Sequence, residues 1–362
     1  MHEANVRLTR FAQEPGVGAN AEVRDLAHLF EAARASSSQP WPVSADLLSG
    51  LSAGDTTRWN LNTAQTLVAA QTFFLPMVDD PFDFGRIAAT GALSPVFASG
   101  ATPLFTLAFM GMPGGVFPEP FIARVAAGQE AGFRTAGTVV TGGSAFESAV
   151  PLLAFVAVGV ARPDRIRDAR GAQPGDAIVL AKPLGMGIYT AALARQKLDA
   201  VAYRDFVERA VQANAAGTAL AAIRNVHALA EVSETGLAGR LLAMCRAASL
   251  TARIAMHAIP SLPHALALAK GGCIARASAR NWNRDGAAIR LDDALMPEAR
   301  ALLTDPQASG GLLVTCKPAS ADRIVKLLHD AGFAEAAEIG RFGEAPPQDA
   351  GRIDASWLEV AS

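Results

Sequence analysis

The chain has 362 residues, of which 51% are hydrophobic and 18% are charged, and its 32 basic and 34 acidic residues leave a formal net charge of −2. This balance offers no excess of positive charge for a phosphate backbone, which argues against nucleic-acid binding. Its three cysteines lack CxxC spacing, which argues against a disulfide framework or a zinc site. The first ten residues contain no apolar signal segment, and the longest apolar run, residues 152–160, is too short to cross a bilayer. We therefore expect a soluble, cytoplasmic protein that makes no membrane contact.

The first half of the chain predicts an irregular arm followed by mixed helices and strands. One proline and two glycines in residues 14–20 exclude regular structure there, whereas residues 25–35 have helical spacing. Further helices are expected at 84–98 and 121–136, and strands at 66–78, 104–110, 138–141 and 152–160. The irregular intervals between these elements favour an α+β fold over a doubly wound parallel sheet.

The second half predicts another α+β unit of similar size. Residues 162–176 combine proline, glycine and charge, which is typical of a linker. Beyond it we expect strands at 177–181 and 312–316, and helices at 188–196, 206–223, 239–247 and 321–331. The predicted organisation is an arm and helix over 1–45, an N-terminal domain over 46–165 and a C-terminal domain over 172–350.

Two common types of site find little support in the sequence. Gly185-Met186-Gly187 follows a predicted strand but has no third glycine, so we interpret it as a strand-to-helix turn rather than a dinucleotide site. His227, His257 and His264 stand alone without metal-ligand spacing, which is more typical of packed or surface histidines.

The carboxylates around Pro81 are more informative. Asp79, Asp80 and Asp83 precede Arg86 at the expected start of a helix. Clustered carboxylates on a loop are able to hold Mg²⁺ against phosphate groups. The alternative is that an aspartate caps the helix while Arg86 forms a surface ion pair. The residues alone leave both interpretations open.

Longer segments resemble the selenophosphate synthetase (selenide, water dikinase) family. In the family's order, they are residues 6–11, 73–90, 141–143, 182–187 and 305–313. The resemblance covers nearly the whole chain and implies a PurM-like fold, related to aminoimidazole ribonucleotide synthetase. In that fold the N-terminal domain forms a β-barrel with its counterpart at a dimer interface, and the C-terminal domain is an α/β sandwich.

The resemblance also implies a reaction and a set of ligands. ATP and selenide would give selenophosphate, AMP and phosphate, with Mg²⁺ neutralising the polyphosphate. The residues that the resemblance assigns to nucleotide binding are Gly16, Gly18, Arg86, Gly142, Gly143 and Lys182.

The arm departs from the family at its reactive positions. Where the family reads roughly Gly-Cys-Gly-Cys-Lys, this chain has Gly16-Val17-Gly18-Ala19-Asn20. Val17 and Ala19 supply no thiol, and Asn20 places no positive charge against a transferring phosphoryl group. No catalytic residue of the family's arm is therefore matched.

The family's metal-binding aspartates are also depleted. Asp55 is kept, and Glu231 replaces one aspartate with a carboxylate one methylene longer. Either Gln71 or Thr72 stands at another aspartate position, and Ser94-Pro95 replaces a Ser-Asp pair. With Asp79 and Asp80 nearby, the candidate metal set is Asp55, Asp79, Asp80 and Glu231, which is too small to hold two Mg²⁺ ions readily.

Two hypotheses follow. In the first, the chain is an ATP-dependent phosphotransferase acting on selenide or a related acceptor through an eroded active site. In the second, it is a catalytically inactive PurM-like paralogue that binds a nucleotide or a partner subunit. In either case we expect a homodimer, or a heterodimer with an intact synthetase.

Overall fold

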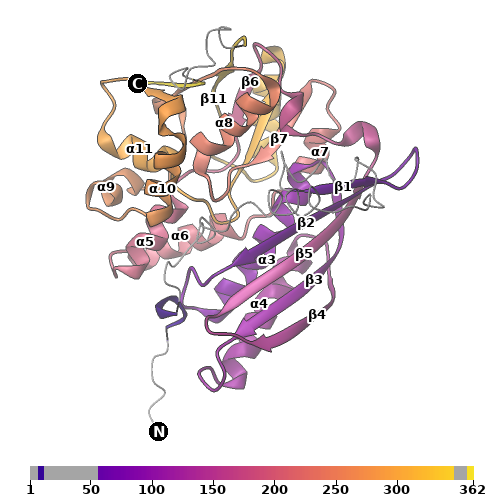
Figure 1. The fold of residues 1–362 in the computed structure, drawn as a ribbon, viewed down its shortest axis with the longest axis vertical. Coiled ribbons are helices and arrows are strands. Elements are labelled where there is room, and N and C mark those ends of the chain that lie inside the picture. Colours follow the sequence, from indigo (N-terminus) through magenta and orange to yellow (C-terminus); the bar gives the residue numbers. More distant parts are fainter. Residues whose placement is uncertain (1–6, 12–55, 346–356) are drawn as a thin grey trace, which may run out of the picture.

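A computed structural model describes residues 7–11, 56–345 and 357–362. These residues form two α+β units, each built on its own sheet (Figure 1). Most neighbouring strands run antiparallel, so the prediction of an α+β fold is confirmed. The helix predicted at 25–35 lies outside the described residues.

The N-terminal sheet has five strands in the order β1-β2-β5-β3-β4. They are β1 (Thr57–Asn60), β2 (Thr66–Phe74), β3 (Thr102–Met112), β4 (Val140–Glu147) and β5 (Leu152–Ala161). β4 runs parallel to β3, and the other neighbouring pairs are antiparallel. Exposure alternates along β2 and β5, which gives the sheet one deeply buried face.

Helices α3 (Pro81–Ala98) and α4 (Glu119–Thr135) cover that buried face (Figure 1). They pack closely because α4 presents Gly128 and Gly132 to α3. A Cβ on Gly128 would lie 2.1 Å from the Phe82 carbonyl oxygen, and one on Gly132 would lie 2.8 Å from the Ala89 Cβ. The opposite face of the sheet leaves Phe73 38% and Leu104 48% exposed.

The C-terminal sheet has seven strands in the order β7-β10-β6-β11-β8-β12-β9. They are β6 (Ala177–Leu180), β7 (Val226–Glu231), β8 (Ala252–Ala255), β9 (Ile289–Leu291), β10 (Leu312–Cys316), β11 (Ala337–Phe342) and β12 (Leu358–Ala361). Its helices are α5 (Met186–Ala194), α6 (Ala200–Ala210), α7 (Ala216–Ala221), α8 (Gly236–Ala248), α9 (Ala265–Lys270), α10 (Arg276–Asp285), α11 (Pro297–Leu303) and α12 (Ala321–Asp330).

This second sheet is covered on both faces, as the predicted α/β sandwich requires. Every residue of β6 and β10 is buried. Ile178 and Leu180 belong to the cluster that includes α8, whereas the alternate residue Val179 packs with side chains of α7 and α12. Strands buried on both sides are continuously apolar, which explains why these two are recognisable in the sequence.

The single helix predicted over 206–223 is wrong. α6 ends at Ala210 and α7 begins at Ala216, with an irregular segment between them. That segment turns because its polar groups bond elsewhere: the Gln212 carbonyl accepts from Lys182, and the Asn214 amide donates across the molecule. Tertiary contacts here override local helix propensity.

The described strands of the N-terminal unit form an open sheet with β1 and β4 at its edges, not a closed barrel. The barrel at a dimer interface needs a second chain and stays a prediction. None of the described helices is long and apolar enough to span a membrane.

Candidate functional site

The two units meet where the later part of α3 faces the C-terminal sheet. Asn214 is 1% exposed, and its Nδ2 donates to Ser94 Oγ at 2.5 Å and to the Gly310 carbonyl at 2.7 Å. Nearby, Thr218 Oγ1 donates to the Ala101 carbonyl at 2.9 Å. One side-chain amide therefore joins a helix of the first unit to a turn of the second.

Lys182 lies at the same junction, two residues after the end of β6. Its Nζ is buried and donates to the Gln212 carbonyl at 2.6 Å and to the Ser309 carbonyl at 2.7 Å. Burial lowers the pKa of Lys182 to about 7, and the charge of Glu231 opposes this shift. The assignment of Lys182 to a phosphate stays a prediction, and it requires the ammonium group to leave these two carbonyls.

The turn Ser309-Gly310-Gly311 fits between Lys182 and the end of β7. A Cβ on Gly310 would lie 1.9 Å from the Val232 carbonyl oxygen, and one on Gly311 would lie 2.5 Å from the Lys182 nitrogen. The Val232 amide donates to the Gly311 carbonyl at 3.0 Å. Glu231, 4% exposed, is the last residue of β7 and precedes this contact. The structure thus brings Glu231 and Lys182 together, as two of the residues that the sequence assigned to the site.

Three buried oxygens at or near this junction have no hydrogen-bond partner among the described residues. They are Thr72 Oγ1, Asn214 Oδ1 and Ser309 Oγ. Thr72 lies on the same face of β2 as the buried Ala70, whereas Gln71 is exposed on the outer face. Of the two residues that the sequence left open, Thr72 is therefore the one that points inward, and it places a neutral oxygen there.

Asp79 lies elsewhere, just before α3, and both of its oxygens are occupied. Arg7 Nε donates to Oδ2 at 2.7 Å, while the Thr9 amide and hydroxyl donate to Oδ1 at 3.0 and 2.7 Å. Partial burial opposes ionisation, but these hydrogen bonds prevail and hold the pKa of Asp79 below its usual 3.8. This carboxylate is open to a metal ion only if Arg7 and Thr9 release it.

Asp80 and Arg86 have the roles that the capping interpretation gave them. Asp80 Oδ1 accepts from the Asp83 amide at 2.9 Å as the N-cap of α3, with Pro81 at the first helical position. Arg86 pairs with Asp83 at 2.8 Å, and the Tyr203 hydroxyl donates to the other Asp83 oxygen at 2.7 Å. Burial and this bond raise the pKa of Tyr203.

The candidate metal carboxylates are not brought together in the described part of the chain. Asp80 and Ser94 are separated along α3 by roughly 20 Å at 1.5 Å per residue, so Asp79 and Asp80 lie far from Glu231. Among residues 7–11, 56–345 and 357–362, no three His, Cys, Asp or Glu side chains are grouped as a metal site needs. These residues alone do not fit Mg²⁺. Six other residues of the prediction lie outside the described part: Gly16, Val17, Gly18, Ala19, Asn20 and Asp55.

Gly142 and Gly143 lie on β4, the exposed edge strand of the N-terminal sheet. Gly143 has φ +153°, and a Cβ there would lie 1.7 Å from the Ala108 carbonyl oxygen. Glycine is thus required at this position by the backbone of β3 itself, whatever ligand the strand contacts.

The turn Gly185–Gly187 is filled from within the protein. Asp305 is completely buried, and its Oδ2 accepts from the Gly187 amide at 2.9 Å at the start of α5. Burial raises the pKa of Asp305 to about 8 against the opposing hydrogen bonds from Gln307 and the α5 amides. The amide that would face a phosphate is already bonded, which agrees with the interpretation of this segment as a structural turn.

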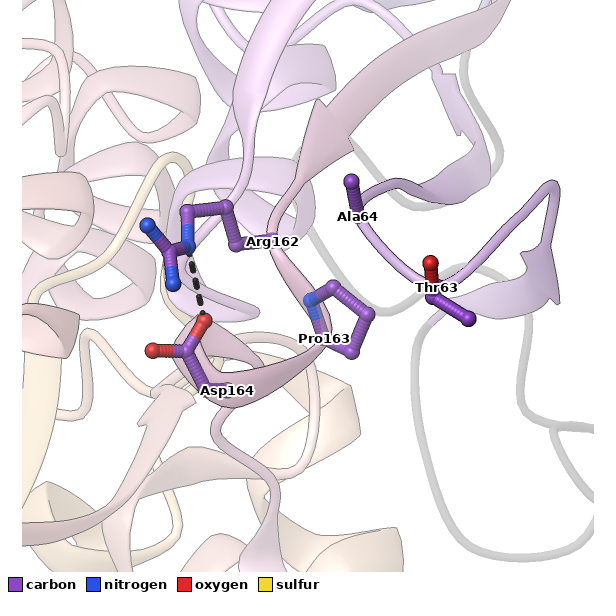
Figure 2. A pocket seen from close by; sticks show the side chains of 5 residues that line it. All are labelled: Thr63, Ala64, Arg162, Pro163 and Asp164. Carbon is purple, nitrogen blue, oxygen red and sulfur yellow. Dashed lines mark hydrogen bonds and ion pairs between the residues drawn. The ribbon is translucent and has the colours of Figure 1, made fainter.

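Two pockets lie away from these residues. One, of about 490 Å³, lies beside the β1–β2 hairpin and is lined by Thr63, Ala64, Arg162, Pro163 and Asp164 (Figure 2). Arg162 there is hydrogen-bonded to Asp164 at 3.0 Å. The other, of about 340 Å³, lies against α5 and α6 and includes Tyr189 and His264. Neither contains a residue of the predicted site.

The junction residues Asn214 and Ser309 and the partners of Asp79 are not among the residues predicted from the sequence. The family resemblance could have pointed to some of them. Arg7 and Thr9, the partners of Asp79, lie in the first segment that resembles the family, and Ser309 lies in the last. Asn214 lies in none of these segments, and its role emerges only from the fold.

Comparisons with known proteins agree with this architecture. Residues 54–161 match the model of the AIR synthase related protein N-terminal domain, and residues 173–350 match that of the C-terminal domain. A solved structure of hydrogenase maturation protein HypE in complex with ATP is 18% identical, with a TM-score of 0.59, and the match covers 94% of this chain and 93% of that chain. At this identity the likeness shows the fold alone.

Curated relatives are more similar. The selenide, water dikinase of Paraburkholderia xenovorans (strain LB400) is 43% identical over 335 residues, covering 92% of this chain and 93% of that protein. The selenide, water dikinase of Burkholderia pseudomallei (strain K96243) is 42% identical over 351 residues, covering 97% of both. The chain therefore belongs to the AIR synthase-related, PurM-like proteins and, among them, to the selenide, water dikinase family.

Proposed function

We propose that this protein is a cytoplasmic, ATP-dependent phosphotransferase of the selenophosphate synthetase type, converting ATP, selenide and water into selenophosphate, AMP and phosphate. The observation that carries the proposal is the identity of about 40% to selenide, water dikinases over nearly the whole chain. The fold alone would not support this activity, because proteins with the same fold catalyse unrelated reactions.

The junction residues support a site between the two domains. Glu231 and Lys182 place a carboxylate and an amine together in a buried region, next to the Asn214 and Ser309 oxygens that no described residue bonds. Unbonded buried polar groups cost stability, so their retention is typical of a site that meets a ligand or ordered water. In this proposal, Gly16, Gly18, Gly142, Gly143 and Arg86 contact the nucleotide.

Mg²⁺ enters the proposal only through Asp55 and Glu231. A bound magnesium ion would supply positive charge against the polyphosphate. Since the described carboxylates do not form such a site, we assign no step to the ion. The described residues would bind and orient the nucleotide and exclude water from the junction.

The exposed face of the N-terminal sheet supports a homodimer. Phe73 and Leu104 lie there with large exposed fractions, and Phe146 of β4, which pairs with Gly111 of β3, is 47% exposed. Large apolar side chains gathered on one sheet face are typical of an interaction surface. An intact synthetase with the same face would be the alternative partner.

A second function is favoured by the neutral residues at the family's carboxylate positions. Thr72 points inward without a charge, and Pro95 inside α3 has no side-chain oxygen at all. A catalytically inactive paralogue that binds a nucleotide or a partner subunit would keep the fold and lose these aspartates.

Release of AMP from ATP, measured with and without selenide and Mg²⁺, tests the proposal. The selenide, water dikinase of Paraburkholderia xenovorans serves as the positive control. We expect selenide-dependent AMP release that is slower than that of the control. Release no greater than in buffer would reject catalysis and leave the second function, which binding of a non-hydrolysable ATP analogue would then examine.

A further inference from the structure

The N-terminal turn Arg7–Phe11 is fixed to the fold through one carboxylate. Asp79 receives three hydrogen bonds from it, two of them from Thr9 and one from the guanidinium of Arg7. A 3₁₀ turn over Leu8–Arg10 presents these donors to the loop before α3. Charge-assisted hydrogen bonds of this kind are about twice as strong as neutral ones.

Apolar packing completes the attachment. Leu8 is fully buried in the main core. The Phe11 ring lies 5.4 Å from that of Phe117, which stacks on Phe121 of α4 at 4.9 Å. A segment of five residues thus contacts the regions before α3 and around the start of α4, although it lies about 70 residues before Asp79 in the chain.

The geometry points to Asp79 as a positioning residue for the N-terminal segment and not a metal ligand. Each of its two oxygens already has a donor, and the nearest carboxylate in sequence, Asp80, is committed to capping α3. Because Phe11 precedes the glycine-containing residues 14–20 in the sequence, Asp79 fixes the last described residues before them. Its effect on ligand binding rests on the proposed function, whereas its effect on the turn does not.

Trypsin cleavage after Arg10 tests the attachment without any ligand. Arg10 is exposed, but a protease needs the surrounding backbone to open. We expect Asp79→Asn to accelerate cleavage at Arg10 at least tenfold. Asp80→Asn is the matched control, since it removes the adjacent carboxylate and leaves the turn's bonds intact. Equal cleavage rates in the wild type and Asp79→Asn would overturn the proposal.

Binding of a non-hydrolysable ATP analogue tests the consequence for the site. Asp79→Asn and Thr9→Val are each expected to weaken binding about threefold to tenfold, and the double variant to add little, because both break the same attachment. Weakened binding in Asp79→Asn with normal binding in Thr9→Val would show that Asp79 contacts the ligand itself, and it would overturn the inference. Unchanged binding in both variants would also overturn the inference. Absence of binding in the wild type would reject the proposed function, while the cleavage rates would still decide the attachment.

Discussion

Asn214 and Ser94 form a hydrogen bond of 2.5 Å across the boundary between the two domains. The same amide donates to the Gly310 carbonyl, so one residue of the α6–α7 segment holds both a helix of the first domain and a turn of the second. The orientation of the domains therefore depends on a side chain that belongs to neither sheet.

Replacing Asn214 by Ala should weaken the junction. Two buried acceptors would lose their donor, at a cost of about 3 kcal/mol in the free energy of unfolding. Calorimetric unfolding measures this loss, and we expect the transition to broaden as the domains become less coupled. Asn225→Ala, which removes a half-buried bond to Ser320 within the second domain, is the control and should leave the width unchanged. An unfolding transition of wild-type width in Asn214→Ala would contradict the role of Asn214 in coupling the two domains.

Gly310→Ala tests the close approach of the turn to β7. The added methyl group would lie 1.9 Å from the Val232 carbonyl oxygen, so the backbone must shift at a cost of about 3 kcal/mol. Gly115→Ala is the comparison, because Gly115 has φ +70° but nothing within 4 Å of its Cβ position. That variant should lose only about 1 kcal/mol from backbone strain. Urea unfolding of both variants measures which one loses more free energy of unfolding. An equal loss in the two variants would argue against the steric explanation.

Thr72→Asp restores a carboxylate at the inward-facing position of β2. Without a metal ion, the new charge would be poorly solvated at the buried position of the Thr72 hydroxyl, and the melting temperature should fall by several degrees. With millimolar Mg²⁺ we expect at least part of this loss to be recovered. Gln71→Asp places the same charge on the exposed outer face and should show neither effect. A Mg²⁺ response in Gln71→Asp and none in Thr72→Asp would refute the assignment.

The stability difference between the wild type and Asp79→Asn should depend on pH. The pKa of Asp79 is lower in the folded protein than its usual 3.8, so its ionised form stabilises the fold above that pH. At pH 7 we expect a difference of about 2 kcal/mol from the lost charge-assisted bonds. The difference should shrink as the pH falls from about 3.8 through the lower folded-state pKa of Asp79, because the unfolded chain takes up the proton first and the folded carboxyl is protonated only at the lower pH. Denaturant unfolding between pH 3 and 7 measures it, and a constant difference would count against the ion pair with Arg7.

Phe73→Glu should disrupt the proposed dimer. The side chain is 38% exposed on the outer face of the N-terminal sheet, where a buried charge at an interface would be costly. Sedimentation velocity should show a dimer for the wild type and a monomer for this variant. Val201→Glu, at a 67% exposed position of α6, is the control and should remain dimeric. A monomeric wild type would exclude the homodimer.

Local pattern predicted four of the five described strands of the N-terminal sheet but only β6 and β10 of the seven described strands of the C-terminal sheet. β10 was predicted at its observed bounds because Leu312–Cys316 is a short apolar run between turn residues, and α3 was predicted to within three residues from the spacing of its apolar side chains. The helix over 206–223 was wrong because the bonds of Gln212 and Asn214 are made with residues far away in the chain. No periodicity within the segment encodes those partners.

The candidate site was harder to predict, since residue type does not tell which partner a side chain takes. Asp79 and Glu231 are both carboxylates that the sequence assigned to a metal site. In the structure, Asp79 is bound by Arg7 and Thr9, whereas Glu231 is the last residue of the buried strand β7 and lies near Lys182. Similarly, Lys182 has the charge that a phosphate contact needs, but its ammonium is buried against two backbone carbonyls.

The last strand of the chain has a consequence for biosynthesis. β12 lies between β8 and β9 and pairs in parallel with both, so among the described strands β12 alone joins β9 to the C-terminal sheet. A ribosome covers the most recently made residues of a growing chain, so this sheet is completed only after residues 358–361 have left the ribosome, whereas the strands of the N-terminal sheet are available much earlier. The N-terminal domain should therefore fold before the C-terminal domain. Deletion of residues 358–362 should prevent the C-terminal domain from completing its sheet.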